Sequence, residues 1–268
     1  MTRVITIANQ KGGVGKTTST VNIAGALAQG GARVVVVDLD PQGNASTAIG
    51  VDHREGVPGI YEVLIGDAAM ADVEQSCPDI PLLSCIPATI DLAGAEIELV
   101  SQVAREYRLS RALEGYLAEA NADREPIDYV LLDCPPSLGL LTLNGLVAAR
   151  EVLLPIQCEY YALEGLSQLL RTIDMVKTHL NPQLEVSAIL LTMYDGRTRL
   201  AAQVAEEVRM HFGARVLGTV IPRNVRVSEA PSYGQTVVTY DPSSPGALTY
   251  RQAAEELAAI RPQSYPQQ

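Results

Sequence analysis

The chain has 268 residues, of which 47% are hydrophobic, and it carries a net charge of −11 at pH 7. The hydrophobic content is ample for a buried core. The net negative charge excludes a surface that attracts nucleic acid at every point, because the average electrostatic field repels phosphate. Any contact with DNA must therefore be local. With no Trp and one Phe, the core must be aliphatic.

Strand-like and helix-like segments alternate along the chain. An apolar strand at residues 4–8 precedes a helix at 19–29, and four consecutive valines at 34–37 predict a strand buried on both faces. This alternation predicts an α/β fold with a doubly wound, mostly parallel sheet flanked by helices, and ligands at the carboxyl ends of the strands. Further strands are predicted at 82–86, 129–133, 152–156, 188–193 and 216–221, and helices at 92–120, 139–149, 162–179, 199–212 and 247–260.

The domain organisation follows from composition. No Pro/Ser-rich linker interrupts residues 1–260, so we expect a single domain there, followed by a flexible Pro- and Gln-rich tail at 261–268. The chain contains no run of 18 apolar residues, so no membrane span is predicted. We also find no signal peptide before the first strand, and we therefore expect a cytoplasmic protein. The four cysteines show neither a CxxC pair nor zinc spacing and are expected to be reduced and structural.

The segment Lys-Gly-Gly-Val-Gly-Lys-Thr-Thr, at residues 11–18, joins the first strand to the first helix. Backbone N–H groups of a glycine-rich turn and the positive end of a helix hold polyphosphate oxygens. Lys16 would reach the outer phosphates of a nucleotide, and Thr17 would offer its hydroxyl to Mg²⁺. A turn that only tightens packing is the alternative. The predicted nucleotide-binding residues here are Lys11, Gly12, Gly13, Val14, Gly15, Lys16, Thr17 and Thr18.

This loop departs from the ordinary P-loop pattern. Gln10 stands where that pattern has a glycine, and a second lysine, Lys11, precedes the glycines. One phosphate group does not need two lysines from one loop, which suggests that Lys11 serves something outside its own site. In these residues the chain resembles the deviant Walker A ATPases, and the ParA/Soj partition proteins most closely. The resemblance covers nearly the whole chain and includes the segments 191–198 and 220–234.

Three carboxylates follow the ends of predicted strands. Asp133 precedes Cys-Pro-Pro, in the form of a Walker B carboxylate that holds Mg²⁺, often through water. Asp38 and Asp40 end the valine strand, where alternation predicts that both side chains point to the same side of the sheet. The resemblance implies that Asp38 joins Thr17 and Asp133 around Mg²⁺ and that Asp40 orients the attacking water. A helix cap for Asp133 and turn formation for Asp38 and Asp40 are the alternatives.

The resemblance also implies ATP hydrolysis, in which Lys11, Lys16 and Asp40 are the catalytic residues. Phosphoryl transfer depends mostly on positioning and on neutralising charge, which a second lysine strengthens. In the resembling family, this lysine crosses a nucleotide-sandwich dimer and contacts the ATP of the partner, whereas a solvated loop lysine is the alternative. Pro222 and Asn224 match positions that stack on adenine and offer an amide to its edge, and a plain turn is the alternative there.

Arg197 and Arg226 match family positions that bind DNA regardless of sequence, and we expect both in exposed loops. The resemblance therefore implies a partition ATPase with ATP and Mg²⁺ as cofactors. Its ATP-dependent homodimer would bind double-stranded DNA nonspecifically on the nucleoid, and a ParB-like centromere-binding protein would stimulate hydrolysis.

Four other functions remain as alternatives. A MinD-like membrane ATPase would need an amphipathic C-terminal helix, which the two prolines within 261–268 disfavour. An iron–sulfur carrier on this fold would need paired cysteines, and a metabolic ligase or kinase would need a small-molecule motif that we do not find. A ParA-like cargo-positioning ATPase is not separable from a chromosome or plasmid partition protein by sequence.

Overall fold

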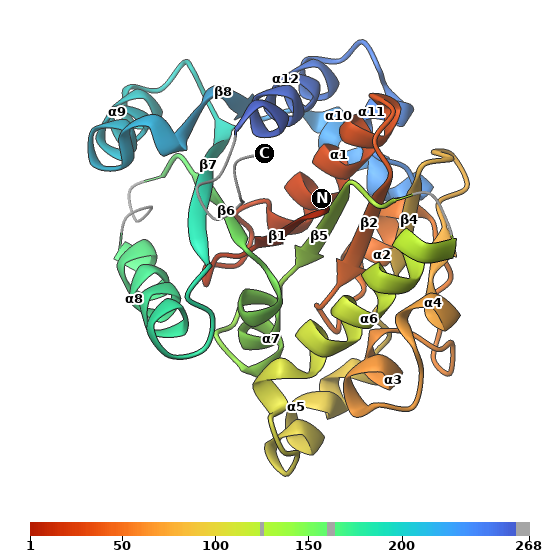
Figure 1. The fold of residues 1–268 in the computed structure, drawn as a ribbon. Helices are drawn as coiled ribbons and strands as arrows, with labels where there is room; N and C mark the ends of the chain where they lie inside the picture. The colour runs from red at the N-terminus through yellow and green to blue at the C-terminus, as the bar shows by residue number, and fades with distance from the viewer. Residues whose placement is uncertain (124–125, 160–163, 261–268) are drawn as a thin grey trace.

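The computed structural model describes residues 1–123, 126–159 and 164–260. A central sheet of eight strands in these residues has the order β3-β4-β2-β5-β1-β6-β7-β8 (Figure 1). Only β3 is antiparallel to its neighbour, and the other adjacent pairs are parallel. The strands are β1 (Arg3–Ile7), β2 (Val34–Asp38), β3 (Gln75–Ser76), β4 (Leu83–Ile86), β5 (Tyr129–Asp133), β6 (Glu151–Gln157), β7 (Glu185–Tyr194) and β8 (Val216–Pro222).

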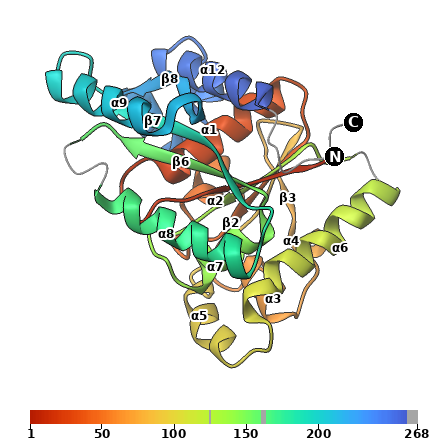
Figure 2. The ribbon, with the colours of Figure 1, turned by 60° about the vertical axis from the view of Figure 1, so that its left-hand side comes forward.

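Helices cover both faces of this sheet (Figure 2), which confirms the predicted doubly wound fold. The α-helices are α1 (Lys16–Gln29), α2 (Asn44–Ile49), α3 (Ile60–Ile65), α4 (Met70–Val73), α5 (Leu92–Val100), α6 (Arg108–Asp123), α7 (Leu140–Ala148), α8 (Glu164–His179), α9 (Arg199–Phe212), α10 (Val225–Glu229), α11 (Val237–Tyr240) and α12 (Pro245–Ala259). The described residues also form three 3₁₀ turns, namely η1 (Arg105–Tyr107), η2 (Gly213–Arg215) and η3 (Ala230–Tyr233).

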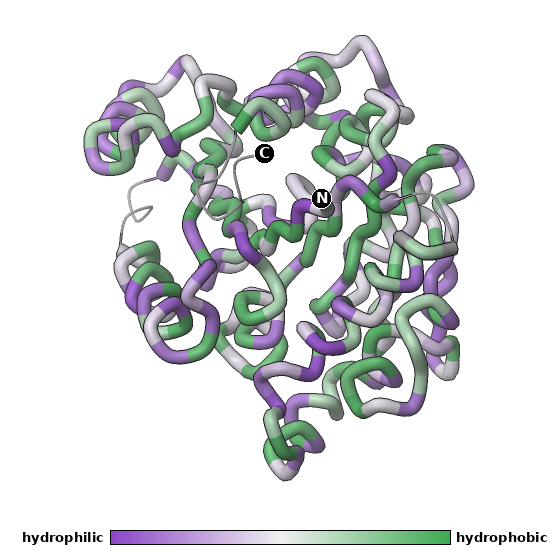
Figure 3. Tube along the Cα trace, viewed as in Figure 1, coloured by the Kyte–Doolittle hydropathy of each residue, from purple (hydrophilic) through white to green (hydrophobic). Residues whose placement is uncertain are grey.

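The four valines of β2 show how the core forms. All four are fully buried, and they alternate between two hydrophobic clusters on opposite faces of the sheet. Val34 and Val36 belong to a cluster with residues of α1, α2, α11 and α12, whereas Val35 and Val37 belong to a cluster with residues of α3 to α9. Hydrophobic residues accordingly follow the inner strands in Figure 3. A strand without a polar face requires this cover on both sides.

One predicted helix is wrong. The structure breaks 92–120 into α5 and α6, and Ala104 between them has a left-handed backbone with φ of 52°. The buried side chain of Asn144 stabilises the break, since its Nδ2 donates to the Arg105 carbonyl at 2.9 Å and its Oδ1 accepts from the Leu109 amide at 3.1 Å.

The short strand β3 and the short helices α2, α3, α4, α10 and α11 were not predicted from the sequence. The first helix begins at Lys16, three residues before the predicted residue 19. The single-domain assignment of residues 1–260 stays a prediction. The tail predicted at 261–268 and the predicted helical positions 162–163 lie outside the described residues.

Candidate functional site

The carboxyl ends of three neighbouring strands meet at one edge of the sheet. In the parallel register of β5 with its two neighbours, both Ile7 of β1 and Asp38 of β2 lie opposite Asp133. The three segments that leave these strands, at residues 8–15, 39–43 and 134–139, therefore start side by side. This is the edge at which doubly wound sheets bind ligands.

The first of these segments is a glycine-rich turn that opens onto α1. Gly13 and Gly15 have φ of 72° and 84°, a left-handed conformation that favours glycine. Gly15 is the N-cap of α1 and supplies no side-chain cap, so the first-turn N–H groups of a 14-residue helix face outward unsatisfied. The Thr192 hydroxyl of β7 holds the turn by donating to the Val14 carbonyl at 2.8 Å. This geometry suits a polyphosphate.

Lys16 places a buried ammonium at this turn. Only 6% of the residue is exposed, and its Nζ donates to the Lys11 carbonyl at 3.3 Å. Burial lowers the pKa of Lys16, and the nearby carboxylates of Asp133 and Asp40 oppose that shift. The Lys16 ammonium therefore lies close to negatively charged carboxylates. Its position at the glycine turn also allows it to bind phosphate oxygens.

Asp133 has one carboxylate oxygen available to bind a cation. Its Oδ1 accepts a hydrogen bond from the Thr20 hydroxyl at 2.8 Å, but its Oδ2 is buried and has no hydrogen-bond partner among the described residues. Burial raises the pKa of Asp133, while the nearby Thr17 and Thr20 hydroxyls act against this shift. An orphaned carboxylate oxygen beside the Thr17 hydroxyl fits Mg²⁺, which prefers oxygen ligands and retains waters.

Asp38 is also fully buried, but both of its oxygens already have partners. Its Oδ2 accepts from the Ser46 amide at 2.9 Å and the Ser46 hydroxyl at 2.8 Å, and its Oδ1 accepts from the Asp40 amide at 3.1 Å. Burial and the charge of Asp133 raise the pKa of Asp38. Two carboxylates this close repel each other, which a divalent cation would relieve.

Asp40 lies beyond the end of β2, so the predicted strand alternation does not extend to it. Its Oδ1 accepts from the Gln42 amide at 3.0 Å, and 8% of the residue is exposed. The turn contacts that were the alternative interpretation for Asp38 and Asp40 are therefore present. They hold both carboxylates in place next to the phosphate turn and are compatible with the predicted roles.

Lys11 and Gly12 face outward from the turn. The Lys11 side chain is 38% exposed, and its Nζ lies 3.7 Å from Oε2 of Glu159. The buried side chain of Asn9, which follows the end of β1, braces this loop. It accepts from the Lys11 amide at 3.0 Å and donates to the Pro155 carbonyl at 2.8 Å.

A cavity of about 540 Å³ adjoins the phosphate turn. Pro222 and Asn224, whose binding to a base stays a prediction, line it, and Gly15 and Thr18 connect it to the turn. Asn224 caps α10, because its Oδ1 accepts from the Arg226 amide at 2.9 Å, which leaves its Nδ2 group as the donor for a ligand. Thr192, Met193 and Tyr250 also line the cavity. The first two lie in the segment 191–198 that carries the resemblance, whereas no local sequence pattern marked Tyr250.

The two predicted DNA-binding arginines are both exposed but lie in different surroundings. Arg197, in the loop between β7 and α9, is 90% exposed and pairs with Asp195 at 2.9 Å. The prediction of a loop is wrong for Arg226, which lies in α10 because Asn224 caps that helix. Its guanidinium contacts Glu229 at 2.8 Å and Asp241 at 3.3 Å.

Comparison with known proteins gives the family. An AAA domain family model matches residues 2–186. The sporulation initiation inhibitor protein Soj of Bacillus subtilis is 52% identical over 97% of this chain and 99% of its own length. The chain belongs to the ParA/Soj family. A second relative, the chromosome-partitioning ATPase Soj of Treponema pallidum, is 46% identical over 97% of this chain and 98% of its own length.

Two solved structures show what related sites hold. Cobyrinic acid a,c-diamide synthase from Mycobacterium smegmatis, with a bound ATP analogue and magnesium, is 41% identical to this ParA/Soj-family chain, with a TM-score of 0.80 over 95% of this chain and 93% of that one. MinD from Pyrococcus horikoshii, complexed with Mg-ADP, is 27% identical, with a TM-score of 0.75 over 97% of each chain. No helix among the described residues is long and apolar enough to cross a bilayer.

Proposed function

We propose that this ParA/Soj-family chain is an ATPase that segregates DNA. In this proposal, ATP and Mg²⁺ bind at the edge formed by β1, β2 and β5, and bound ATP drives formation of a sandwich dimer. The dimer binds double-stranded DNA without regard to sequence on the nucleoid. A ParB-like centromere-binding protein stimulates hydrolysis and thereby releases the dimer.

One observation carries the proposal. A left-handed glycine turn at the N-terminus of α1 presents a buried lysine beside an aspartate whose Oδ2 lacks a partner among the described residues. The turn, Lys16 and the helix end supply positive charge for a polyphosphate, and Asp133 supplies a carboxylate oxygen for its counter-cation. The adjoining cavity of about 540 Å³ is large enough for a purine.

The roles of the chain's own residues follow from this geometry. The first-turn N–H groups and Lys16 hold the phosphates, and Thr17, Asp133 and Asp38 hold Mg²⁺, which neutralises charge on the phosphate oxygens. Asp40, fixed by its turn contacts, orients the attacking water. The Lys11 side chain is partly exposed and pairs with Glu159, and in this proposal it adds its charge to a nucleotide on a second copy. Pro222 and Asn224 bind the base.

The DNA-binding role rests on Arg197 and Arg226. Each is exposed and engaged in intramolecular ion pairs at the surface. Such exposed pairs contribute only about 0–1 kcal/mol, so a DNA phosphate can replace the acidic partner. A dimer doubles these arginines, and binding that a monomer with a net charge of −11 lacks can then appear.

The decisive experiment compares duplex DNA binding with ATP, with ADP and without nucleotide, using two unrelated sequences. We expect retention only with ATP, equal for both sequences and weakened by salt. Equal retention in all three nucleotide states would contradict the proposal. Sedimentation with lipid vesicles serves as the comparison for a MinD-like role, for which the relevant tail lies outside the described residues.

A second candidate comes from the Mycobacterium smegmatis structure, whose name describes an amide-forming synthase. The two Soj relatives are more similar to this chain, and the one from Treponema pallidum is named a chromosome-partitioning ATPase, which favours the first proposal. Phosphate release measured with DNA and with cobyrinic acid plus an ammonia source separates the two. Stimulation by cobyrinic acid alone would favour the synthase.

A further inference from the structure

A single carboxylate connects the two ends of the proposed nucleotide site. Glu159 follows the end of β6, and its two oxygens face different cations. Its Oε2 lies 3.7 Å from the Lys11 Nζ, and its Oε1 lies 3.0 Å from the Arg223 Nη2. The Gln157 amide also donates to Oε1. Three separate segments of the chain thus meet at this side chain.

The two cations belong to the two parts of the site. Lys11 is in the phosphate turn, and Arg223 lines the cavity that we assign to the base. The Glu159 carboxylate lies between Lys11 and Arg223 and balances their positive charge. Without this carboxylate, a bound nucleotide would attract both cationic side chains. All three side chains are partly exposed, at 38% for Lys11, 44% for Glu159 and 55% for Arg223, so their contacts can exchange without unfolding.

We propose that Glu159 is a positioning residue that keeps Lys11 on its own subunit until ATP and a second copy compete for it. This inference rests on the proposed function, in which Lys11 contacts the ATP of the partner. Lys11 has to leave Glu159 before it can reach across the interface. The Glu159 contact therefore sets the ATP-dependent threshold for dimerisation and disfavours dimers in which no γ-phosphate replaces it.

The strength of the contact suits such a switch. An exposed ion pair changes an equilibrium constant by about 1.4- to 5-fold. A symmetric dimer releases two of these pairs, so removing the carboxylate should tighten the dimer by about 2- to 30-fold. A buried pair would be too strong for this role, because the nucleotide could not break it at low cost.

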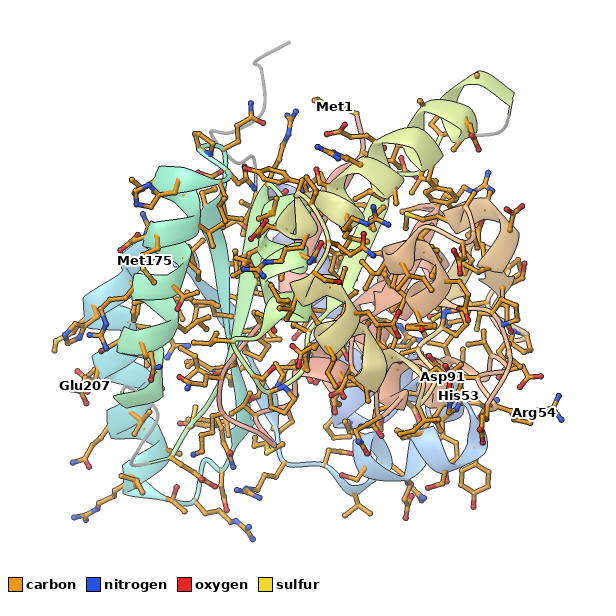
Figure 4. The ribbon with its side chains drawn as sticks, turned by 90° about the horizontal axis from the view of Figure 1, so that it is seen from below. Met1, His53, Arg54, Asp91, Met175 and Glu207 are labelled. Atoms are coloured by element: carbon orange, nitrogen blue, oxygen red, sulfur yellow. The ribbon has the colours of Figure 1, made fainter. Side chains whose placement is uncertain are left out.

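The test measures dimer dissociation constants by sedimentation with saturating ATP, in a background of Asp40→Ala to slow hydrolysis. Glu159→Gln keeps the shape of the side chain and should tighten the dimer by the stated factor, with the melting temperature unchanged. Glu159→Lys, which repels Lys11, should tighten it further. Glu207→Gln is the matched control, because it removes the same charge from the exposed surface of α9 (Figure 4) and should have less effect.

Salt supplies a readout that a purely structural role would not move. The advantage of Glu159→Gln should shrink between about 50 mM and about 500 mM NaCl, because salt screens exposed pairs. A dimer constant that is unchanged or weaker in Glu159→Gln overturns the inference. If the Asp40→Ala protein stays monomeric with ATP, the proposed function fails along with it. A dimer that forms normally but ignores Glu159 refutes the inference alone.

Discussion

Gly12→Val tests whether the phosphate turn faces a second copy of the chain. Gly12 is exposed, and a Cβ atom added there would have the Pro136 Cβ as its nearest neighbour, at 4.0 Å. This is an ordinary van der Waals distance, so the chain itself has room for the side chain. Exposed substitutions of this kind change stability by no more than about 0.5 kcal/mol. Gly13 and Gly15 differ, because their positive φ makes any substitution strained.

The cost should appear only when two copies meet. Inserting extra methyl groups into a close-packed interface costs about 1–3 kcal/mol for each substituted residue, and a twofold dimer contains two copies of that residue. The dimer should therefore lose about 2–6 kcal/mol, which corresponds to a dissociation constant higher by about 30-fold to about 10⁴-fold. Gly12→Ala, with one carbon instead of three, should give a smaller loss.

Two assays separate the local effect from the interface effect. Calorimetry should find ATP binding to Gly12→Val close to that of the unchanged chain, and light scattering with ATP should find monomers. The reasoning is refuted if the variant dimerises at unchanged protein concentration. It is also refuted if nucleotide binding is lost, since the side chain would then act inside its own cradle.

Three further substitutions address the other roles. Lys16→Ala should weaken ATP binding by about 10- to 150-fold, the worth of a hydrogen bond to a charged group, and retained tight binding in a nucleotide-affinity assay would contradict the assignment. Asp40→Ala should bind ATP and dimerise, but its rate of phosphate release should fall by about 10²-fold or more. An undiminished rate of release would refute the role of Asp40 in positioning water. Arg226→Glu should weaken DNA retention without changing ATP affinity. A mobility shift across a salt series should then show a shallower slope, by about 0.9 for each lost phosphate contact. Unaltered retention would place the DNA surface elsewhere.

Much of the fold was predictable because its signals are local. Four consecutive valines have no polar face to offer solvent, and all four are fully buried. The predicted strand at 129–133 matches β5 residue for residue. The phosphate turn was recognisable because its chemistry lies in eight consecutive residues between a strand and a helix. In each of these cases the pattern that predicts the structure lies in neighbouring residues of the chain.

The errors arose where the residues next to each other in the chain do not determine the local structure. The apolar pattern of 92–120 continues through the break after α5, and the side chain of Asn144, from the distant helix α7, stabilises the left-handed turn there. Arg226 was placed in a loop because α10 has only five residues, too few for a helical period to be visible. The contact between Lys11 and Glu159 depends on β1 lying next to β6, which residue spacing does not reveal.

The central claim is that a bound triphosphate joins two copies of this chain through Lys11. A crystal structure with a slowly hydrolysed ATP analogue and Mg²⁺ tests it most directly. We expect a twofold dimer in which each Lys11 has left Glu159 and its Nζ lies within hydrogen-bond distance of the γ-phosphate on the other subunit. Separate copies with the analogue bound and Lys11 still paired with Glu159 would contradict the claim.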